Sequence, residues 1–261
     1  RFLGEEFDGA AAGAFEQIDW SREPDFMWSI DVGDGYGIGS VSEGRYYQCD
    51  AEGGRGRLVS SNAQERLRCF DLATGELIWS QAEPLSYRDL YQYEEGPRSS
   101  PTIDGERVLT YGVSGRLVCR QKSDGEKLWE VDTNGVFGVV QNFFGVGSSP
   151  LVLDGRVIVM VGGSPREDQD IPPGQLDRVI SNGSAIVAFD LETGKEEWRC
   201  GDDLASYSSP RTVRVGSETL VLAFARGGLL AIEPDSGRVR WRFDHRASIL
   251  ESVNAMVPVV D

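Results

Sequence analysis

Four stretches of the chain alternate apolar and polar residues with a period of two. Their apolar positions are Leu67 and Cys69, Leu117 and Cys119, Ile186 and Ala188, and Leu229 and Ala231. A period of two places alternate side chains on one face, which predicts a half-buried β-strand in each case. The second apolar position of each pair is small, which indicates close packing at that point.

Each predicted strand leads into a polar turn and a second strand that ends in tryptophan. Residues 70–79 and 189–198 are almost identical in sequence. Residues 232–241 have an acidic residue, Glu233, at the position of Asp71, whereas residues 120–129 have Gln121 there. Glycine supplies the positive φ of such a turn, and Asp71 is expected to accept hydrogen bonds from turn N–H groups. The repeat thus marks eight structural positions, namely Gly75, Gly125, Gly194, Gly237, Trp79, Trp129, Trp198 and Trp241.

Further β-rich runs precede each of these hairpins. They cover residues 46–49, 108–111, 157–161 and 220–224, and Ser-Ser-Pro opens three of the units at 99–101, 148–150 and 208–210. Each unit therefore has four short predicted strands. The four tryptophans are 50, 69 and 43 residues apart. Four strands at such a period are typical of a propeller blade.

This combination of Ser-Ser-Pro, a glycine-punctuated hairpin and the acid–Thr/Ser–Gly–Trp string resembles the PQQ-like, quinoprotein-type β-propeller repeat. The family includes PQQ-dependent alcohol dehydrogenases and non-catalytic envelope propellers of the BamB type, and the chain is also similar to uncharacterised planctomycete-type members. The resemblance implies an all-β fold, a β-propeller of four-stranded antiparallel blades. Four full blades are visible, and the family's usual seven or eight predict that the chain is a truncated portion of such a ring.

The domain boundaries follow from the repeat. Residues 1–24 are interpreted as an irregular N-terminal leader segment, and 25–261 as the propeller. The blades are expected at about 36–80, 97–131, 147–200 and 207–243, with the start of a further blade at 255–261. Residues 26–30 around Trp28 are interpreted as an extra outermost strand of the last blade.

Composition narrows the classes of partner. The formal charge of −16 repels phosphate backbones, so no nucleic-acid partner is expected. The chain has no apolar run of membrane-spanning length, and we expect no membrane span. The single histidine and the four cysteines show no zinc-ligand spacing, so no metal site is predicted. Cys69 and Cys119 take a position that is alanine in the other blades and are expected to be buried.

The resemblance also allows a test for a cofactor. In the dehydrogenase members, adjacent cysteines form a disulfide ring beside the quinone, and Glu, Asn and Asp hold a calcium ion near an Asp base. This sequence has no Cys-Cys pair, and no carboxylate matches those ligands by motif. No cofactor is predicted, PQQ included, and no catalytic residue is assigned. The sequence also lacks a GxSxG motif and a Walker loop.

The remaining chemistry lies in the connections between blades, where polar and aromatic residues gather. Loops on a rigid scaffold often carry binding groups. The candidate ligand rim is Tyr36, Arg98, Gln141, Asn142, Tyr207, Glu251 and Asn254, with Tyr93 in the same connection as Arg98. The alternative is that these side chains only cap strand ends.

Three functional hypotheses follow. The first is a non-catalytic module that binds a protein or a glycan in the periplasm, in the cell envelope or after secretion. The second is a PQQ- or metal-dependent oxidoreductase. The third is a sensor or scaffold domain of a larger multidomain protein.

Overall fold

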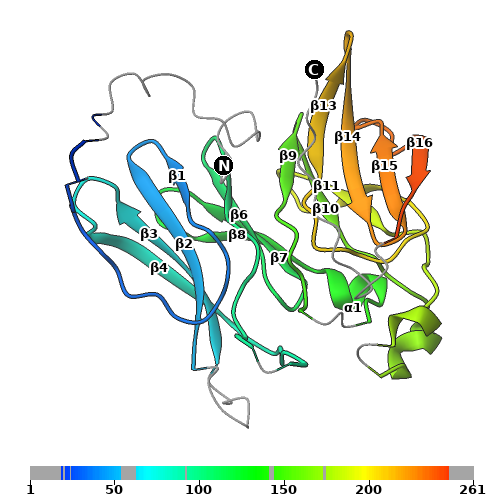
Figure 1. Cartoon of the computed structure of the whole chain (residues 1–261), viewed down its shortest axis with the longest axis horizontal. Coiled ribbons are helices and arrows are strands. Elements are labelled where there is room, and N and C mark those ends of the chain that lie inside the picture. The colour runs from blue at the N-terminus through cyan, green and yellow to red at the C-terminus, as the bar shows by residue number, and fades with distance from the viewer. Residues whose placement is uncertain are drawn as a thin grey trace.

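The protein is an all-β propeller of four blades (Figure 1). The computed structural model describes residues 19, 21–23, 25–53, 63–91, 93–140, 144–172 and 175–246. Within these residues, helix is confined to α1 (Thr133–Phe137) and the 3-10 helices η2 (Arg166–Asp170) and η3 (Leu176–Arg178). The all-β prediction from the repeat is confirmed.

Each blade is an antiparallel sheet whose strands pair in chain order. Blade one contains β1 (Ser40–Ser42), β2 (Arg45–Glu52), β3 (Gln64–Asp71) and β4 (Leu77–Pro84). Blade two contains β5 (Thr102–Asp104), β6 (Arg107–Tyr111), β7 (Arg116–Gln121) and β8 (Lys127–Asp132). Blade three contains β9 (Leu151–Leu153), β10 (Arg156–Met160), β11 (Ile186–Asp190) and β12 (Glu196–Cys200). Blade four contains β13 (Arg211–Val215), β14 (Glu218–Ala225), β15 (Gly228–Ile232) and β16 (Val239–Asp244).

The small residue of each repeat lies directly opposite the repeat tryptophan. Cys69 pairs with Trp79 across β3 and β4, and the register shifts at the next residue. The other blades repeat this pairing and the shift, in the pairs Cys119 and Trp129, Ala188 and Trp198, and Ala231 and Trp241. A larger side chain at the small position would compete with the indole for the same space, because directly opposed residues have neighbouring Cβ atoms.

The tryptophan of one blade contacts the turn of the next blade. The indole Nε1 donates to a backbone carbonyl of that turn in three cases, Trp79 to Lys122 at 3.1 Å, Trp129 to Leu191 at 2.9 Å and Trp198 to Pro234 at 2.9 Å. The ring lies over the turn glycine, which is Gly125, Gly194 or Gly237. Trp241 differs, since 46% of its surface is exposed and the described residues include no turn of a following blade.

Trp28 takes the corresponding place on blade one. Its Nε1 donates to the carbonyl of Leu72 at 2.8 Å, and its ring lies over Gly75. Residues 26–30 form no strand, so the expectation of an extra outer strand is wrong. The segment is held by its tryptophan on the turn and not by a backbone ladder. The predicted start of a further blade at 255–261 lies outside the described residues.

The turn of blade one is stabilised by Asp71, the acidic residue of the repeat string. Asp71 Oδ1 accepts hydrogen bonds from the N–H groups of Ala73 and Thr74, each at 2.9 Å, as the sequence predicted. Gly75 has a φ of 75°, a conformation that costs other residues energy. These contacts lower the pKa of Asp71, chiefly through the Thr74 backbone N–H. The turn that receives a tryptophan is thus locally rigid.

The Ser-Ser-Pro units join neighbouring blades near their first strands. The Ser149 hydroxyl accepts from the backbone N–H of Ser100 at 2.8 Å, and the Ser209 hydroxyl accepts from Ser149 at 2.9 Å. Thr102 Oγ1 donates to the Pro150 carbonyl at 2.7 Å. These bonds satisfy backbone groups that no strand partner reaches.

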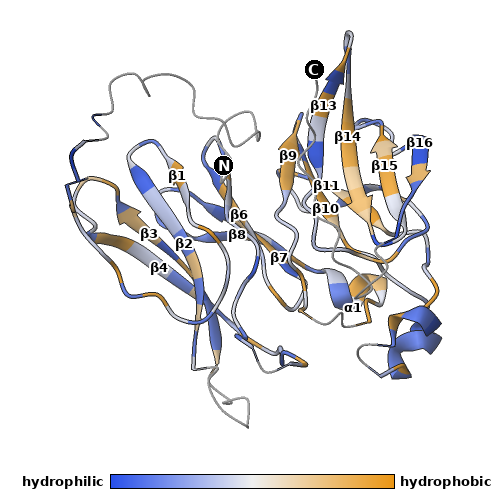
Figure 2. Ribbon diagram, viewed as in Figure 1, coloured by the Kyte–Doolittle hydropathy of each residue, from blue (hydrophilic) through white to orange (hydrophobic). Residues whose placement is uncertain are grey.

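The hydrophobic core lies between adjacent blades. One cluster combines Leu109 and Tyr111 of blade two with Val159 and Phe189 of blade three, and another joins blades three and four. Cys49, Cys69 and Cys119 are buried in this arrangement, and the four cysteines are free. Figure 2 shows that β9 and β14 consist largely of apolar residues, whereas the short helices between β10 and β11 are hydrophilic. No described helix is long and apolar enough to cross a membrane.

Candidate functional site

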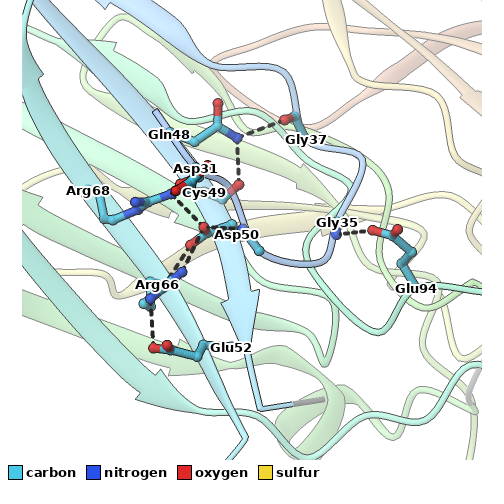
Figure 3. A network of polar contacts seen from close by, with 11 residues as sticks. Asp31, Gly35, Gly37, Gln48, Cys49, Asp50, Glu52, Arg66, Arg68 and Glu94 are labelled. Carbon is cyan, nitrogen blue, oxygen red and sulfur yellow. Dashed lines mark hydrogen bonds and ion pairs between the residues drawn. The ribbon is translucent and has the colours of Figure 1, made fainter. Parts of the chain in front are cut away.

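The segment that enters blade one is fixed by a buried carboxylate. Asp50 on β2 accepts hydrogen bonds from the backbone N–H of Gly33 at 2.7 Å, from Arg66 at 2.9 Å and from Arg68 at 2.6 Å (Figure 3). Asp50 is almost fully buried, and two guanidinium groups compensate its charge. Buried charged groups in proteins are paired in this way because an unpaired one is costly to remove from water.

Residues 34–37 are then held between blade one and the connection that leads to blade two. Asp34 and Ala51 exchange two backbone hydrogen bonds at 2.9 and 2.8 Å. Gly35 N–H donates to Glu94 at 2.7 Å (Figure 3), and Tyr36 N–H donates to the carbonyl of Pro97 at 2.8 Å. The aromatic ring of Tyr36 is thereby placed beside the first blade-to-blade connection.

Asp89 organises that connection from its interior. Its Oδ1 accepts from the backbone N–H groups of Tyr91 at 2.9 Å and Tyr93 at 3.2 Å. Its Oδ2 forms a 2.9 Å ion pair with Arg98, whose guanidinium also donates to the carbonyls of Gly96 and Glu94. Arg98 therefore stabilises the conformation of this connection.

The Arg98 guanidinium also stacks on two rings. It lies 5.5 Å from the centroid of Tyr36 and 5.3 Å from that of Tyr87. Cation–π contact of this kind fixes ring orientation. The ion pair with Asp89 thus holds the guanidinium beside the Tyr36 ring.

Aromatic rings from successive connections converge beside Tyr36. The centroids of Tyr93 and Phe144 are 6.0 Å apart, and those of Phe144 and Tyr207 are 5.5 Å apart. The Tyr207 hydroxyl accepts from the Phe144 backbone N–H at 3.1 Å. Together they enclose an open cavity of about 370 Å³, which we call the aromatic bowl and which is lined by Tyr36, Tyr93, Arg98, Phe144, Gly147 and Tyr207.

The structure brings together three of the seven candidate rim residues. Tyr36, Arg98 and Tyr207 line the aromatic bowl. Gln141, Asn142, Glu251 and Asn254 lie outside the described residues. The sequence reasoning missed Phe144, although its place in a blade-to-blade connection after Gln141 and Asn142 offered a signal.

The bowl has a mainly apolar wall, and titratable side chains lie in the connection that carries Tyr93. Burial raises the pKa of Glu95, a carboxyl group in the same connection as Tyr93. Burial likewise raises the pKa of the Tyr87 hydroxyl, which donates to Asp89 at 3.3 Å and so stays protonated at neutral pH. In the described part of the chain, no three His, Cys, Asp or Glu side chains are arranged to hold a metal ion. The chemistry that the bowl offers is ring stacking and hydroxyl hydrogen bonding.

The repeat and its geometry agree with a comparison against protein families. The family model described as outer membrane protein assembly factor BamB matches residues 63–258. The chain belongs to this PQQ-like, BamB-type repeat family. The BamB protein of Shewanella oneidensis is 26% identical over 179 residues, which cover 64% of this chain and 41% of that protein.

The chain is also similar to two further proteins. The quinone alcohol dehydrogenase subunit of Komagataeibacter europaeus is 27% identical over 149 residues, 55% of this chain and 18% of that protein. The solved BamB structure from Moraxella catarrhalis has 18% identity and a TM-score of 0.32, covering 82% of this chain and 76% of that one. The chain thus spans about two fifths of the curated BamB relative and less of the dehydrogenase subunit.

Proposed function

We propose that this chain is a non-catalytic binding module of the cell envelope that docks a partner protein at the aromatic bowl. The observation that carries the proposal is the convergence of Tyr93, Phe144 and Tyr207 from three successive blade-to-blade connections. Propeller blades hold these connections on a rigid frame. The bowl therefore presents preorganised aromatic surface, which lowers the entropic cost of association.

The exposed tyrosines suit a protein partner. Tyr36 and Tyr93 have more than half of their surface exposed, and Tyr91 adjoins Tyr93 at 6.2 Å between ring centroids. Tyrosine is enriched at protein interfaces because it combines a large apolar ring with a hydroxyl that hydrogen-bonds. The partner expected from this chemistry presents apolar or proline-containing backbone with accessible carbonyl groups.

The names of the relatives support a location in the cell envelope. Those named outer membrane protein assembly factor are envelope proteins by name, and we extend that location to this chain as periplasmic, envelope-associated or secreted. The charge of −16 gives no attraction to nucleic acid.

Two variants of matched exposure test the docking face. Tyr93 in the bowl and Phe243 on β16 are each 62% exposed. The purified chain is used as bait in an envelope extract, and captured proteins are identified by mass spectrometry for wild type, Tyr93→Ala and Phe243→Ala. We expect Tyr93→Ala to lose specific capture at unchanged melting temperature and Phe243→Ala to retain it. Equal capture by all three proteins would reject the bowl as the docking face.

A glycan is the other ligand class that aromatic rings and hydroxyls can bind, because sugar rings stack on aromatic faces. A glycan array probed with wild type and Tyr93→Ala separates the two. Glycan binding that depends on Tyr93, without protein capture, would assign the bowl to a carbohydrate.

Quinone-dependent oxidation is the second candidate function, and the relative named alcohol dehydrogenase (quinone) favours it. The residues do not fit the group: the four cysteines are separate and free, and the described residues include no cluster of three acidic or other metal-ligating side chains. Absorption spectra and dye-linked alcohol oxidation, measured with and without PQQ and Ca²⁺, test this function. A quinone spectrum with turnover would replace the binding proposal.

The third candidate is a sensor or scaffold domain within a longer polypeptide. The chain covers 41% of the Shewanella protein and 18% of the dehydrogenase subunit, so its relatives place similar repeats in proteins of different length. The full coding sequence decides this question, because a fused kinase or other signalling domain would favour the sensor role.

A further inference from the structure

The aromatic bowl is a curved wall of rings. The planes of Tyr93 and Phe144 are inclined by 32°, and those of Phe144 and Tyr207 by 52°, so the rings do not lie in one flat stack. Tyr91 extends the row, with its centroid 6.0 Å from that of Phe144. The face of an aromatic ring carries partial negative charge and attracts cations. A wall built from several rings therefore favours a cation on an apolar stem over an anion.

One guanidinium already lies on this wall. The Arg98 group is 5.5 Å from the ring centroid of Tyr36, which is within the range of cation–π attraction. Arg98 does not make the bowl positive, because its side chain is only 9% exposed and the buried carboxylate of Asp89 compensates its charge. The contact is a precedent within this chain for guanidinium binding by a tyrosine of the bowl.

The segments that carry the bowl residues are acidic. They are the entry segment 31–39, with Tyr36, and the connections 85–101, 133–150 and 201–210. Together they contain seven Asp and Glu residues, two Arg and no Lys, so their net charge is −5. A surface of this sign raises the local concentration of a cationic partner and repels an anionic one. The charge of the bowl's surroundings and the chemistry of its wall thus favour the same kind of guest.

Glu94 places a carboxylate between two tyrosines of the bowl. It follows Tyr93 in the chain, and its Oε2 accepts from the backbone N–H of Gly35, the neighbour of Tyr36, at 2.7 Å (Figure 3). This hydrogen bond fixes the carboxylate at the edge of the bowl. A guanidinium pairs well with a carboxylate because its N–H donors form a planar fork.

We propose that the partner segment inserts an arginine side chain into the aromatic bowl, where the guanidinium stacks on the rings and pairs with Glu94. This inference rests on the docking function proposed above and names the residue that the partner supplies. Arginine suits the bowl better than lysine, because a planar guanidinium is more weakly hydrated than an ammonium group and stacks on aromatic faces.

Isothermal titration calorimetry of the purified chain with two blocked peptides tests the proposal. One peptide is Leu-Pro-Arg-Pro-Leu. In the other, citrulline replaces arginine, which keeps the shape of the side chain and removes its charge. We expect saturable binding of the arginine peptide at physiological salt and about tenfold weaker binding of the citrulline peptide, the size of effect that a desolvated cation–π contact supplies.

Attraction to the acidic chain as a whole would also favour the arginine peptide, so one set of variants changes the ring alone. Tyr93→Leu keeps every charge and an apolar side chain but removes the ring, whereas Tyr93→Phe keeps the ring. We expect Tyr93→Leu to bind the arginine peptide about tenfold more weakly at unchanged melting temperature. Tyr93→Phe should retain binding, as should Phe243→Leu, which alters a side chain of the same exposure on β16.

A second pair of variants is matched in charge. Glu94→Gln keeps an acceptor for the Gly35 N–H and removes the carboxylate at the bowl. Glu126→Gln removes the same charge from the exposed turn between β7 and β8, at the opposite end of the blade from the connections. We expect only Glu94→Gln to weaken binding of the arginine peptide.

Equal affinity for the arginine and citrulline peptides would overturn the proposal, as would the absence of saturable binding by the arginine peptide. Equal binding by wild type and Tyr93→Leu, or equal weakening by Glu94→Gln and Glu126→Gln, would also overturn it. The docking function has its own readout. If Tyr93→Ala loses capture in the envelope extract while the two peptides bind alike, docking stands and only the arginine is rejected.

Discussion

The indole ring of Trp79 in blade one lies so close to Gly125 in blade two that a Cβ built on Gly125 would be 2.7 Å from the ring atom Cε3. The same indole donates to the carbonyl of Lys122. A tryptophan and a glycine separated by a blade boundary are therefore one packing unit. This unit joins each described blade to the next.

The first prediction concerns the tryptophans. Trp79→Ala should lower the free energy of unfolding by about 3–5 kcal/mol, because it removes a buried aromatic ring between two blades. Trp241→Ala is the control within the same repeat. Its ring is 46% exposed, and we expect a loss below about 1 kcal/mol. Urea unfolding measures both, and equal losses would contradict the interblade role.

The second prediction concerns the turn glycine. Gly194 has a φ of 68°, and an added Cβ would be 2.7 Å from the Trp129 ring, so Gly194→Ala combines backbone strain with a clash. Gly155 has a φ of 76° and open space around it. Gly155→Ala should cost about 1–2 kcal/mol, the penalty of the left-handed conformation alone.

Gly194→Ala should cost at least about 1 kcal/mol more than Gly155→Ala, because overpacking adds to the strain. Thermal unfolding of the two variants, followed by circular dichroism, measures the difference. Similar melting temperatures would show that the indole moves aside without cost.

The third prediction concerns pH. Glu65 on β3 accepts a 3.0 Å hydrogen bond from the backbone N–H of Val113 in blade two, and burial between the blades raises its pKa from 4.5 to about 7. Arg98 and Arg116 face it and lower the pKa, whereas the nearby carboxylate of Glu83 raises it.

Between about pH 4.5 and pH 7 the folded state retains a proton on Glu65 that the unfolded state has released. Stability from this group is therefore complete below pH 4.5 and is lost as the pH rises through 7. Glu65→Gln keeps an acceptor for Val113 and carries no charge. We expect the stability gained by this variant over wild type to increase from pH 5 to pH 8 in urea unfolding. A constant difference would contradict the raised pKa.

The fourth prediction concerns the thiols. Burial raises the pKa of Cys119 and of Cys200 to about 12 and that of Cys49 well above its ordinary value. A thiol reagent at pH 8 should label Cys49, Cys69 and Cys119 only after denaturation, since neither access nor thiolate is available in the native protein. Mass spectrometry of the labelled peptides gives the rates. Fast native labelling of Cys69 would contradict its place opposite Trp79.

Much of the fold was predictable because the repeat contains the same local strand and turn signals four times. The period of two, the acid of the turn and the small residue opposite Trp79 or Trp198 each follow from one strand or one hairpin. The docking of a tryptophan on the next blade needed only the additional idea that blades stack. Residues 26–30 were misread because a single tryptophan does not reveal whether a backbone partner is present.

The candidate site was only partly predictable. Tyr36 and Tyr207 were found because aromatic residues in blade-to-blade connections gather on one face. Phe144 was missed, and the contacts of Arg98 with Asp89 and two backbone carbonyls could not be read from the sequence. Contacts within irregular connections have no period in the sequence, so their partners emerge only in three dimensions.

The hydrogen bonds to the serine hydroxyls between the blades run in one direction, from the backbone N–H of one unit to the hydroxyl of the next. Ser149 accepts a hydrogen bond from blade two with its hydroxyl and donates its own N–H to Ser209 of blade four. The unit of blade three thus carries one half of a joint on each flank, and both halves lie within a single stretch of coding sequence. Copying that stretch copies the joint as well. Head-to-tail contacts of this kind let gene duplication lengthen a propeller without requiring any new interface to evolve.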